Sequence, residues 1–258
     1  MPQNKQKQHI LITGATGGIG SALAKIYASP EVRLSIFGRD VDKLEKIAKQ
    51  CQDLGAEVAT YTCDLRAFAE LRLTINKIDT ECPVDLVIAN AGVAVYLDSQ
   101  VDRESWEQIE ETIDINLTSA IATVTPLIAS MQQRQKGQIA LVSSMAAYRG
   151  IAVSPSYCAS KAGLKAYAES LRLLLKKANI KVSVICPGFV ESAMSARFPG
   201  PKPFLLSAPR AAVIIKKGLQ KNQGNITFPR LLGFGTRALT VLPDSIVGFI
   251  LKKLSYTF

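Results

Sequence analysis

The sequence predicts an α/β fold, a Rossmann-like doubly wound parallel sheet of about seven strands with helices on both faces. Two observations lead to this prediction. Short apolar runs of strand length alternate with longer amphipathic segments along most of the 258 residues. A glycine-rich turn directly follows the first apolar run, as it does where a strand of a parallel sheet leads into a helix. Such alternation implies parallel strands joined by right-handed crossovers.

The apolar runs are the predicted strands, and the amphipathic segments between them are the predicted helices. Strands are expected at 9–13, 32–37, 56–61, 84–89, 138–143, 180–186 and 225–228, and helices near 18–28, 41–52, 66–80, 104–131, 156–178 and 208–222. Pro126 is expected to bend or interrupt the fourth helix. Residues 190–207 contain three prolines and no periodic pattern, which predicts a mobile substrate loop over the site.

One dinucleotide-binding catalytic domain over 1–258 is expected, because no linker, low-complexity stretch or internal repeat divides the chain. The five cysteines show no metal-binding spacing, which predicts reduced thiols, a cytoplasmic protein and no metal site. Residues 1–8 are polar and lack the apolar core of a signal peptide, so secretion is not expected.

The positive charge is concentrated in the last quarter of the chain. The net charge is +10, and residues 192–258 hold ten Lys or Arg against one acidic residue, a balance of +9. This asymmetry indicates an anionic partner, such as a membrane surface, an acidic substrate or a nucleic acid, or else a solvated basic face. No recognised nucleic-acid motif accompanies the charge, so a nucleic-acid partner is not expected.

Tyr157 and Lys161 are the first candidate catalytic pair. Four residues apart on a helix, they lie on one face, one turn apart. A nearby positive charge lowers the pKa of a phenol, which could then act as an acid or base near neutral pH. Ser144 follows the apolar run 138–142, and residues at the carboxyl ends of parallel strands line the ligand crevice.

The glycine-rich turn Thr13-Gly14-Ala15-Thr16-Gly17-Gly18-Ile19-Gly20 is the candidate binding site for a pyrophosphate. Its glycines permit a tight turn and let backbone N–H groups approach phosphate at the start of the next helix. Other polar or glycine residues follow later apolar runs, namely Asn90-Ala91-Gly92 and Pro187-Gly188, and Asn116 stands in the segment Asp114-Ile115-Asn116-Leu117.

Together these motifs resemble the short-chain dehydrogenase/reductase family, in its smaller single-domain branch. The resemblance covers roughly residues 9–230, and the motifs occur in the family's order. One departure is Ala89, where the family often has a second asparagine; it removes a side-chain hydrogen bond but no catalytic group.

The resemblance implies reversible hydride transfer between a nicotinamide cofactor and a carbonyl/alcohol pair. It assigns catalysis to Asn116, Ser144, Tyr157 and Lys161. Tyr157 would donate the proton, Ser144 would hold the substrate oxygen, and Lys161 would hold the ribose hydroxyls. Asn116 would support a water that links Lys161 to solvent. The implied cofactor-binding residues are Gly14, Thr16, Gly17, Gly18, Ile19, Gly20, Arg39, Asp64, Leu65, Asn90, Ala91, Gly92, Tyr157, Lys161, Pro187, Gly188, Val190 and Ser192.

The end of the second predicted strand indicates which cofactor is used. Gly38 occupies the family's acidic position and Arg39 follows it, which favours NADP(H), because a guanidinium binds phosphate through charge-assisted bonds. Asp40 is a carboxylate close to this position, so NAD(H) stays possible, although Asp40 fits better as the N-cap of the next helix. Asp64 matches the family position that contacts adenine.

Apolar residues near the expected crevice suit a hydrophobic ketone, an aldehyde or an acyl-chain carbonyl. The candidate substrate contacts are Ser144, Tyr157, Met145, Tyr96 and Met194, and the apolar ones among them could equally pack the loop against the domain. The alternatives are a non-catalytic NADP-binding scaffold or redox sensor, and an NAD-dependent alcohol dehydrogenase. The family also implies a homodimer or homotetramer.

Residues 231–258 form an apolar and basic extension. The run 244–254 is typical of a short helix with a broad apolar face and basic residues at its end, too short to span a bilayer. Either it covers the domain or a partner subunit, or it makes a peripheral membrane contact.

Overall fold

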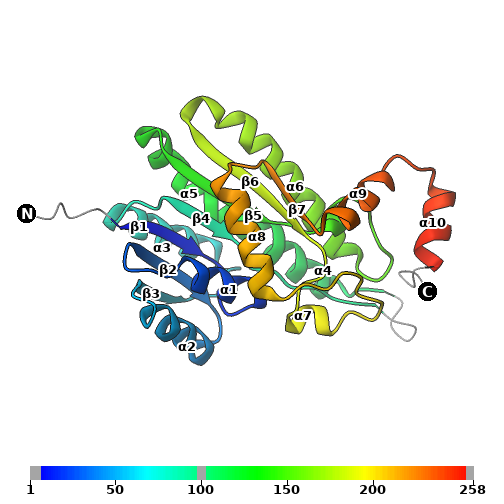
Figure 1. Cartoon of the computed structure of the whole chain (residues 1–258), viewed down its shortest axis with the longest axis horizontal. Helices are drawn as coiled ribbons and strands as arrows, with labels where there is room; N and C mark the ends of the chain where they lie inside the picture. Colours follow the sequence, from blue (N-terminus) through cyan, green and yellow to red (C-terminus); the bar gives the residue numbers. More distant parts are fainter. Residues whose placement is uncertain (1–6, 98–102, 254–258) are drawn as a thin grey trace, which may run out of the picture.

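The computed structural model describes residues 7–97 and 103–253. Its centre is one sheet in which every described pair of strands is parallel, in the order β3-β2-β1-β4-β5-β6-β7 (Figure 1). The strands are β1 (Gln8–Ile12), β2 (Val32–Gly38), β3 (Glu57–Thr62), β4 (Leu86–Ala89), β5 (Gly137–Val142), β6 (Ile180–Pro187) and β7 (Asn225–Phe228). The predicted fold class is confirmed, and each predicted strand boundary lies within two residues of the observed one.

Helices cover both faces of the sheet. They are α1 (Gly18–Tyr27), α2 (Val41–Gln52), α3 (Phe68–Glu81), α4 (Trp106–Ile113), α5 (Ser119–Arg134), α6 (Pro155–Leu174), α7 (Ala193–Ala196), α8 (Ala208–Gln220), α9 (Arg230–Ala238) and α10 (Asp244–Lys253). A π-helical turn, Asp114–Thr118, joins α4 to α5, and short 3₁₀ turns lie at Met145–Ala147 and Lys176–Ala178. The sequence analysis did not predict α9.

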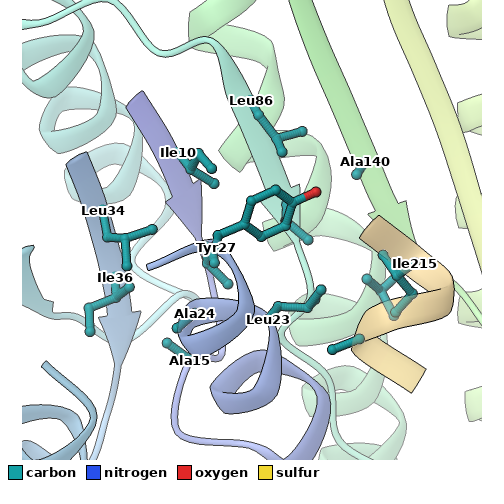
Figure 2. Close-up of a cluster of buried hydrophobic side chains, with 14 of the residues drawn as sticks. Ile10, Ala15, Leu23, Ala24, Tyr27, Leu34, Ile36, Leu86, Ala140 and Ile215 are labelled. Carbon is teal, nitrogen blue, oxygen red and sulfur yellow. The ribbon is translucent and has the colours of Figure 1, made fainter. Parts of the chain in front are cut away.

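Alternate residues of the central strands supply two separate apolar cores. Ile10 and Ile12 face α1, α2 and α8, whereas Leu11 between them faces the side of α3, α5 and α6, because successive side chains of a strand point to opposite faces. Figure 2 shows the first core, where Leu23 and Tyr27 of α1 and Ile215 of α8 pack against the strands. Burial on both faces explains why the strands are continuously apolar.

The predicted fourth helix is interrupted, but not at Pro126. Pro126 lies inside α5, which continues to Arg134, and the irregularity is the π-helical turn at 114–118. Pro126 has no backbone N–H, so it cannot donate the hydrogen bond that another residue would make there. The helix nevertheless continues, and Val124 and Leu127 on either side of Pro126 are buried in the core. The stretch Trp106–Arg134 is long and apolar enough to cross a membrane by length and composition; half of its most apolar window is buried within the domain.

The segment 190–207 contains short regular structure that was not predicted from the sequence. Val190 pairs with Leu206 in a parallel bridge, and α7 begins with a capping box between Ser192 and Ser195. Figure 1 shows α9 and α10 at the end of the molecule remote from β3, with α10 standing outside the layers that cover the sheet. The last five residues of the predicted extension, 254–258, lie outside the described residues.

Candidate active site

A cavity of about 1460 Å³ lies at the carboxyl ends of the strands. It begins at the turn after β1 and includes residues that follow β2, β4, β5 and β6. The strand order reverses between β1 and β4, which is where open α/β sheets bind ligands. The cavity exceeds the roughly 300–1,000 Å³ of ordinary small-ligand sites, so it has room for an extended ligand and a second molecule.

The glycine turn is packed so tightly that side chains are excluded from it. Gly14 has φ +65°, and a Cβ there would lie 2.7 Å from the Cα of Ala91. A Cβ on Gly20 would overlap the carbonyl oxygen of Gly14, and one on Gly18 would lie 2.6 Å from the carbonyl oxygen of Glu191. Gly17 is the N-cap of α1 and has no side chain to cap it. The first N–H groups of α1 therefore fit an anionic group such as a pyrophosphate.

The end of β2 carries positive charge at the cavity. Gly38 is buried with Thr16 against it, and Arg39 is exposed in the cavity wall. Asp40 accepts a hydrogen bond from the backbone N–H of Lys43 at 3.0 Å, and its Oδ2 lies 2.7 Å from Lys43 Nζ. The carboxylate that would favour NAD thus caps α2, as expected. Lys43 also lines the cavity and was not among the predicted site residues. Its position, four residues after Arg39 as a second cation, could have indicated it.

Asp64 and Leu65 line the cavity beyond β3. The guanidinium of Arg66 donates to both carboxylate oxygens of Asp64, at 2.8–3.2 Å, and holds the pKa of that carboxyl at about 2. Asn90, at the end of β4, donates from Nδ2 to the carbonyl oxygens of Thr13 and Gly14, both at 3.1 Å. The ends of β1 and β4 are thereby tied together beneath the glycine turn.

Tyr157 and Lys161 lie one turn apart on α6, with Lys161 Nζ 5.7 Å from the centroid of the Tyr157 ring. Both line the cavity together with Ser144, which follows β5. A hydrogen bond with Ser144 lowers the pKa of Tyr157, but burial raises it by more. The expected lowering of this pKa by Lys161 is therefore not what the structure shows, because desolvation disfavours the phenolate. Tyr157 is a protonated phenol at neutral pH.

Lys161 is held deep in the protein, with 3% of its surface exposed. Its Nζ donates to the carbonyl oxygen of Val142 at 3.0 Å. Burial lowers the pKa of Lys161 to about 8, close enough to neutral pH for the amine to exchange protons.

Asn116 lies behind the cavity wall, not in it. It is fully buried in the π-helical turn, and its side chain accepts from the N–H of Val93 at 2.8 Å and donates to the carbonyl oxygen of Val93 at 2.9 Å. It also donates to Ser160 Oγ at 3.0 Å. A Cβ on Gly92 would lie 3.1 Å from Asn116 Oδ1 and 3.2 Å from Lys161 Nζ. Asn116 thus fixes the segment after β4, at Gly92 and Val93, that faces Lys161.

The alternative hydroxyls have other partners. Ser143 Oγ donates to the carbonyl oxygen of Lys161 at 2.7 Å and is buried. The Tyr148 hydroxyl lies 3.0 Å from Thr227 Oγ1, and Arg237 Nη2 donates to it at 2.9 Å. Ser144 Oγ instead accepts from the N–H of Ala146 at 3.1 Å and borders the cavity. Ser143 also borders the cavity, but its hydroxyl is bonded to the backbone, and Tyr148 is not part of the lining, so Ser144 and Tyr157 are the hydroxyls that can face a ligand.

Most of the predicted site residues border this single cavity. Among the predicted residues, Gly20 and Asn116 are in its supporting layer, and the cavity lining includes Gly14, Thr16, Gly17, Gly18, Ile19, Arg39, Asp64, Leu65, Asn90, Ala91, Gly92, Tyr96, Ser144, Met145, Tyr157, Lys161, Pro187, Gly188, Val190, Ser192 and Met194.

The end of the cavity beyond Tyr157 is mostly apolar, with the cation Arg197 close enough to Tyr96 to act on it electrostatically. Tyr96 meets Phe198 edge to face, with ring centroids 5.3 Å apart, and Phe198 lies 4.9 Å from Phe189. The sequence analysis missed the rest of this wall, which α9 and α10 supply through Leu231, Leu232, Gly235, Thr236, Leu239 and Ile250. Only the alternation of apolar residues with Gly and Thr in 231–250 could have signalled it, and that pattern does not say what the helices cover.

A parallel sheet with a phosphate-sized glycine turn, a buried lysine and a cavity-facing tyrosine defines a dinucleotide-dependent oxidoreductase. The family model described as short chain dehydrogenase matches residues 8–201. An uncharacterized oxidoreductase of Myxococcus xanthus is 34% identical over 245 residues, covering 95% of this chain and 96% of its own. The chain belongs to the short-chain dehydrogenase/reductase family, and it is an enzyme that acts on a carbonyl/alcohol pair with NAD(P).

Two further proteins show how far the likeness extends. A 3-dehydrosphinganine reductase of Arabidopsis thaliana is 34% identical over 200 residues, which cover 74% of this chain and 60% of that protein. The crystal structure of an actinorhodin polyketide ketoreductase variant with NADPH superposes with a TM-score of 0.79 at 22% identity, covering 88% of this chain and 97% of the other. The latter likeness shows the fold.

Proposed function

We propose that this enzyme is an NADPH-dependent reductase of apolar ketones, aldehydes or acyl-chain carbonyls, built as one catalytic domain. The observation that carries the proposal is the position of Tyr157, Ser144 and Lys161 on one cavity, between the glycine turn and an apolar end. When bound, the nicotinamide supplies a hydride to the carbonyl carbon.

The choice of NADPH rests on the cations after β2. With Gly38 in place of a carboxylate, the charged groups after β2 at the cavity are Arg39 and the ion pair of Asp40 with Lys43, and Arg39 is the cation that would bind a ribose 2′-phosphate. The NADPH carried by the ketoreductase neighbour agrees with this choice. Asp64 and Leu65, which line the cavity, would border the adenine, and Val190 and Ser192 would border the nicotinamide end.

The proton in this reaction comes from Tyr157. Because burial raises its pKa, Tyr157 carries its proton at neutral pH and can donate it to the carbonyl oxygen as negative charge develops there. Ser144, whose Oγ is oriented by the N–H of Ala146, holds the same oxygen. Lys161 holds the ribose hydroxyls and supplies the replacement proton, and Asn116 keeps the backbone facing Lys161 in place.

An apolar substrate fits the far end of the cavity. Tyr96, Met145 and Met194 border it, with Phe189 and Phe198 around them. Relatives include proteins named as 3-dehydrosphinganine and ketoacyl reductases, whose names denote carbonyls on long or extended chains.

We also infer a cytoplasmic homodimer or homotetramer. All five cysteines are free thiols, as suits a reducing compartment. Trp106 on α4 and Leu173 and Leu174 on α6 are each at least 68% exposed, so these helices carry apolar surface for another subunit.

Binding of NADPH and NADH, followed by fluorescence titration, tests the cofactor. Arg39→Ala should weaken NADPH binding by about 10- to 100-fold, the value of a charge-assisted bond, and leave NADH binding nearly unchanged. Lys49→Ala removes an exposed cation from the same helix as Lys43 and should change neither. Equal binding of both cofactors by the wild type would overturn the choice and favour an NAD-dependent alcohol dehydrogenase.

A panel of ketones with NADPH tests the chemistry. Tyr157→Phe keeps the ring at the cofactor site and should still bind NADPH, while kcat falls about 10²- to 10⁴-fold, since the proton donor is removed. Cofactor binding without turnover of any carbonyl by the wild type would favour the non-catalytic scaffold instead.

A further inference from the structure

The two C-terminal helices carry apolar side chains on two opposite sides. On one side, Leu232, Leu239 and Ile250 line the cavity, and Val247 is buried. On the other side, apolar side chains of α9, α10 and the loop between them are exposed by 46–82%. We call these the C-terminal apolar surface: Leu231, Phe234, Val241, Ile246 and Phe249.

Helices whose apolar side chains extend beyond the face that the domain covers leave apolar surface in contact with water. In α10, Ile246 and Phe249 stand three residues apart and share a face. Val247 and Ile250 form a second such pair, shifted by one residue, and therefore point to a different side of the helix. The inner pair is covered by the domain, whereas the outer pair faces solvent. Because α9 and α10 lie at one end of the molecule, with α10 outside the layers of the sheet, a flat surface can reach them (Figure 1).

The charge around this surface selects its partner. Of the ten basic residues in 192–258, Arg230 and Arg237 of α9 lie next to this surface and are exposed, and Arg237 also donates to the hydroxyl of Tyr148. Two copies meeting through this surface would bring like charges together, which opposes self-association. Exposed aromatic and aliphatic side chains flanked by cations are instead what an interfacial helix presents to anionic lipid.

The cavity reaches the same surface. Leu231 is 72% exposed and also lines the cavity, so its side chain belongs both to the outside of α9 and to the wall of the site. We propose that the C-terminal apolar surface docks on an anionic phospholipid bilayer and that substrate dissolved in the bilayer enters the cavity past Leu231. The entry route rests on the function proposed above; the docking does not.

Docking is tested by co-sedimentation of the full chain with vesicles. The protein should pellet with vesicles of mixed phosphatidylglycerol and phosphatidylcholine, and much less with phosphatidylcholine alone. Binding should fall at about 1 M salt, where the Debye length is about 3 Å. Phe234→Ser with Phe249→Ser should weaken the partition at least about tenfold, because two aromatic side chains no longer leave water.

The matched control is Leu73→Ser, which removes an equally exposed apolar side chain from α3 and should pellet like the wild type. Unchanged NADPH binding shows that each variant is folded. Docking is overturned if the wild type stays in solution with anionic vesicles, or if the double variant pellets as well as the wild type. A wild-type dimer that the double variant dissociates, without pelleting, would assign the surface to a second copy.

The entry route is tested with two ketones, one long-chain and dissolved in the vesicles, the other short and soluble. Anionic vesicles should raise the wild-type rate with the long-chain ketone. The double variant should lose this increase and keep the wild-type rate with the short ketone. Equal stimulation in both proteins overturns the route. No turnover of either ketone overturns the proposed function and the route together, while the pelleting result still decides docking.

Discussion

At the scale of single residues, the site combines two groups whose ionisation is governed by burial. Burial raises the pKa of Tyr157 and lowers the pKa of Lys161 to about 8. Each change disfavours the charged form in a poorly solvated wall. The spacing of the two residues in the sequence could be read as a pair on one helix face, but the direction of the Tyr157 pKa depends on surroundings that only the folded chain supplies.

The buried charge of Lys161 should lower the free energy of unfolding. A fall in its pKa from 10.5 to about 8 corresponds to as much as roughly 3 kcal/mol of penalty for keeping the charge. We expect Lys161→Met to abolish turnover and to raise the free energy of unfolding by about 1–3 kcal/mol at pH 7. Urea unfolding measures the gain.

The sign of the pH dependence follows from linkage. Between pH about 8 and 10.5 the unfolded chain binds more protons at Lys161 than the folded chain does, so the penalty is complete below pH 8 and fades as the pH rises. The advantage of the variant should shrink over that range. Lys181→Met, at an exposed position on β6, should show no such advantage; a destabilised Lys161→Met at pH 7 would contradict the argument.

At the scale of elements, the π-helical turn between α4 and α5 is the irregularity that positions Asn116. It places Asn116 opposite Val93, in the segment that follows β4, where one amide side chain satisfies both backbone groups of that residue. Because π-helical turns are rare and often mark functional sites, this irregularity agrees with the role inferred for Asn116. No sequence pattern distinguished it from regular helix, so the expected break was placed at Pro126 instead.

Asn116→Ala should lower the free energy of unfolding by about 2–4 kcal/mol, because it leaves the buried groups of Val93 and Ser160 without their partner. It should also reduce turnover by displacing the backbone next to Lys161. Urea unfolding and steady-state kinetics measure the two effects. Thr125→Ala removes an exposed helix hydroxyl in α5 and should cost less than about 0.5 kcal/mol. Equal effects from the two variants would remove the special role of Asn116.

At the scale of the whole molecule, one buried histidine links three segments of the sheet's amino-terminal edge. His9 Nδ1 lies 2.7 Å from the carbonyl oxygen of Cys82, and Nε2 lies 2.8 Å from Ser35 Oγ. Since a carbonyl only accepts, Nδ1 carries the proton and Nε2 accepts from the serine. The neutral ring is therefore satisfied, and burial lowers its pKa below 6.5.

This histidine should make the fold sensitive to mild acid. Below pH about 6.5 the unfolded chain takes up a proton at His9 that the folded chain resists, so stability falls until the pH reaches the folded pKa. Thermal melting between pH about 7 and 5 should show this fall. His9→Gln, which can still donate and accept, should fall less steeply; parallel curves for the two proteins would assign the acid sensitivity to other groups.

The sequence by itself determined the sheet, the crossover helices and most of the site. Apolar runs, glycine turns and helical spacing are patterns of residues close together in the sequence. Most residues of the predicted site stand just after a strand or one helix turn from another site residue, so such patterns reveal them. Fold class and family were therefore predicted and are confirmed. The preference for NADP(H) stays a prediction; it was drawn from Arg39 and the capping role of Asp40, which depend on neighbours within four residues.

The tertiary structure alone decided what α9 and α10 do and how the site ionises. Ile250 meets the cavity from a position more than 90 residues after Tyr157, and no local pattern encodes which surface a helix covers. The burial that sets the protonation of Tyr157 and Lys161 likewise arises from chain segments brought together by folding. Contacts and desolvation between distant segments are properties of the packed chain, which is why residue types and spacing did not reveal them.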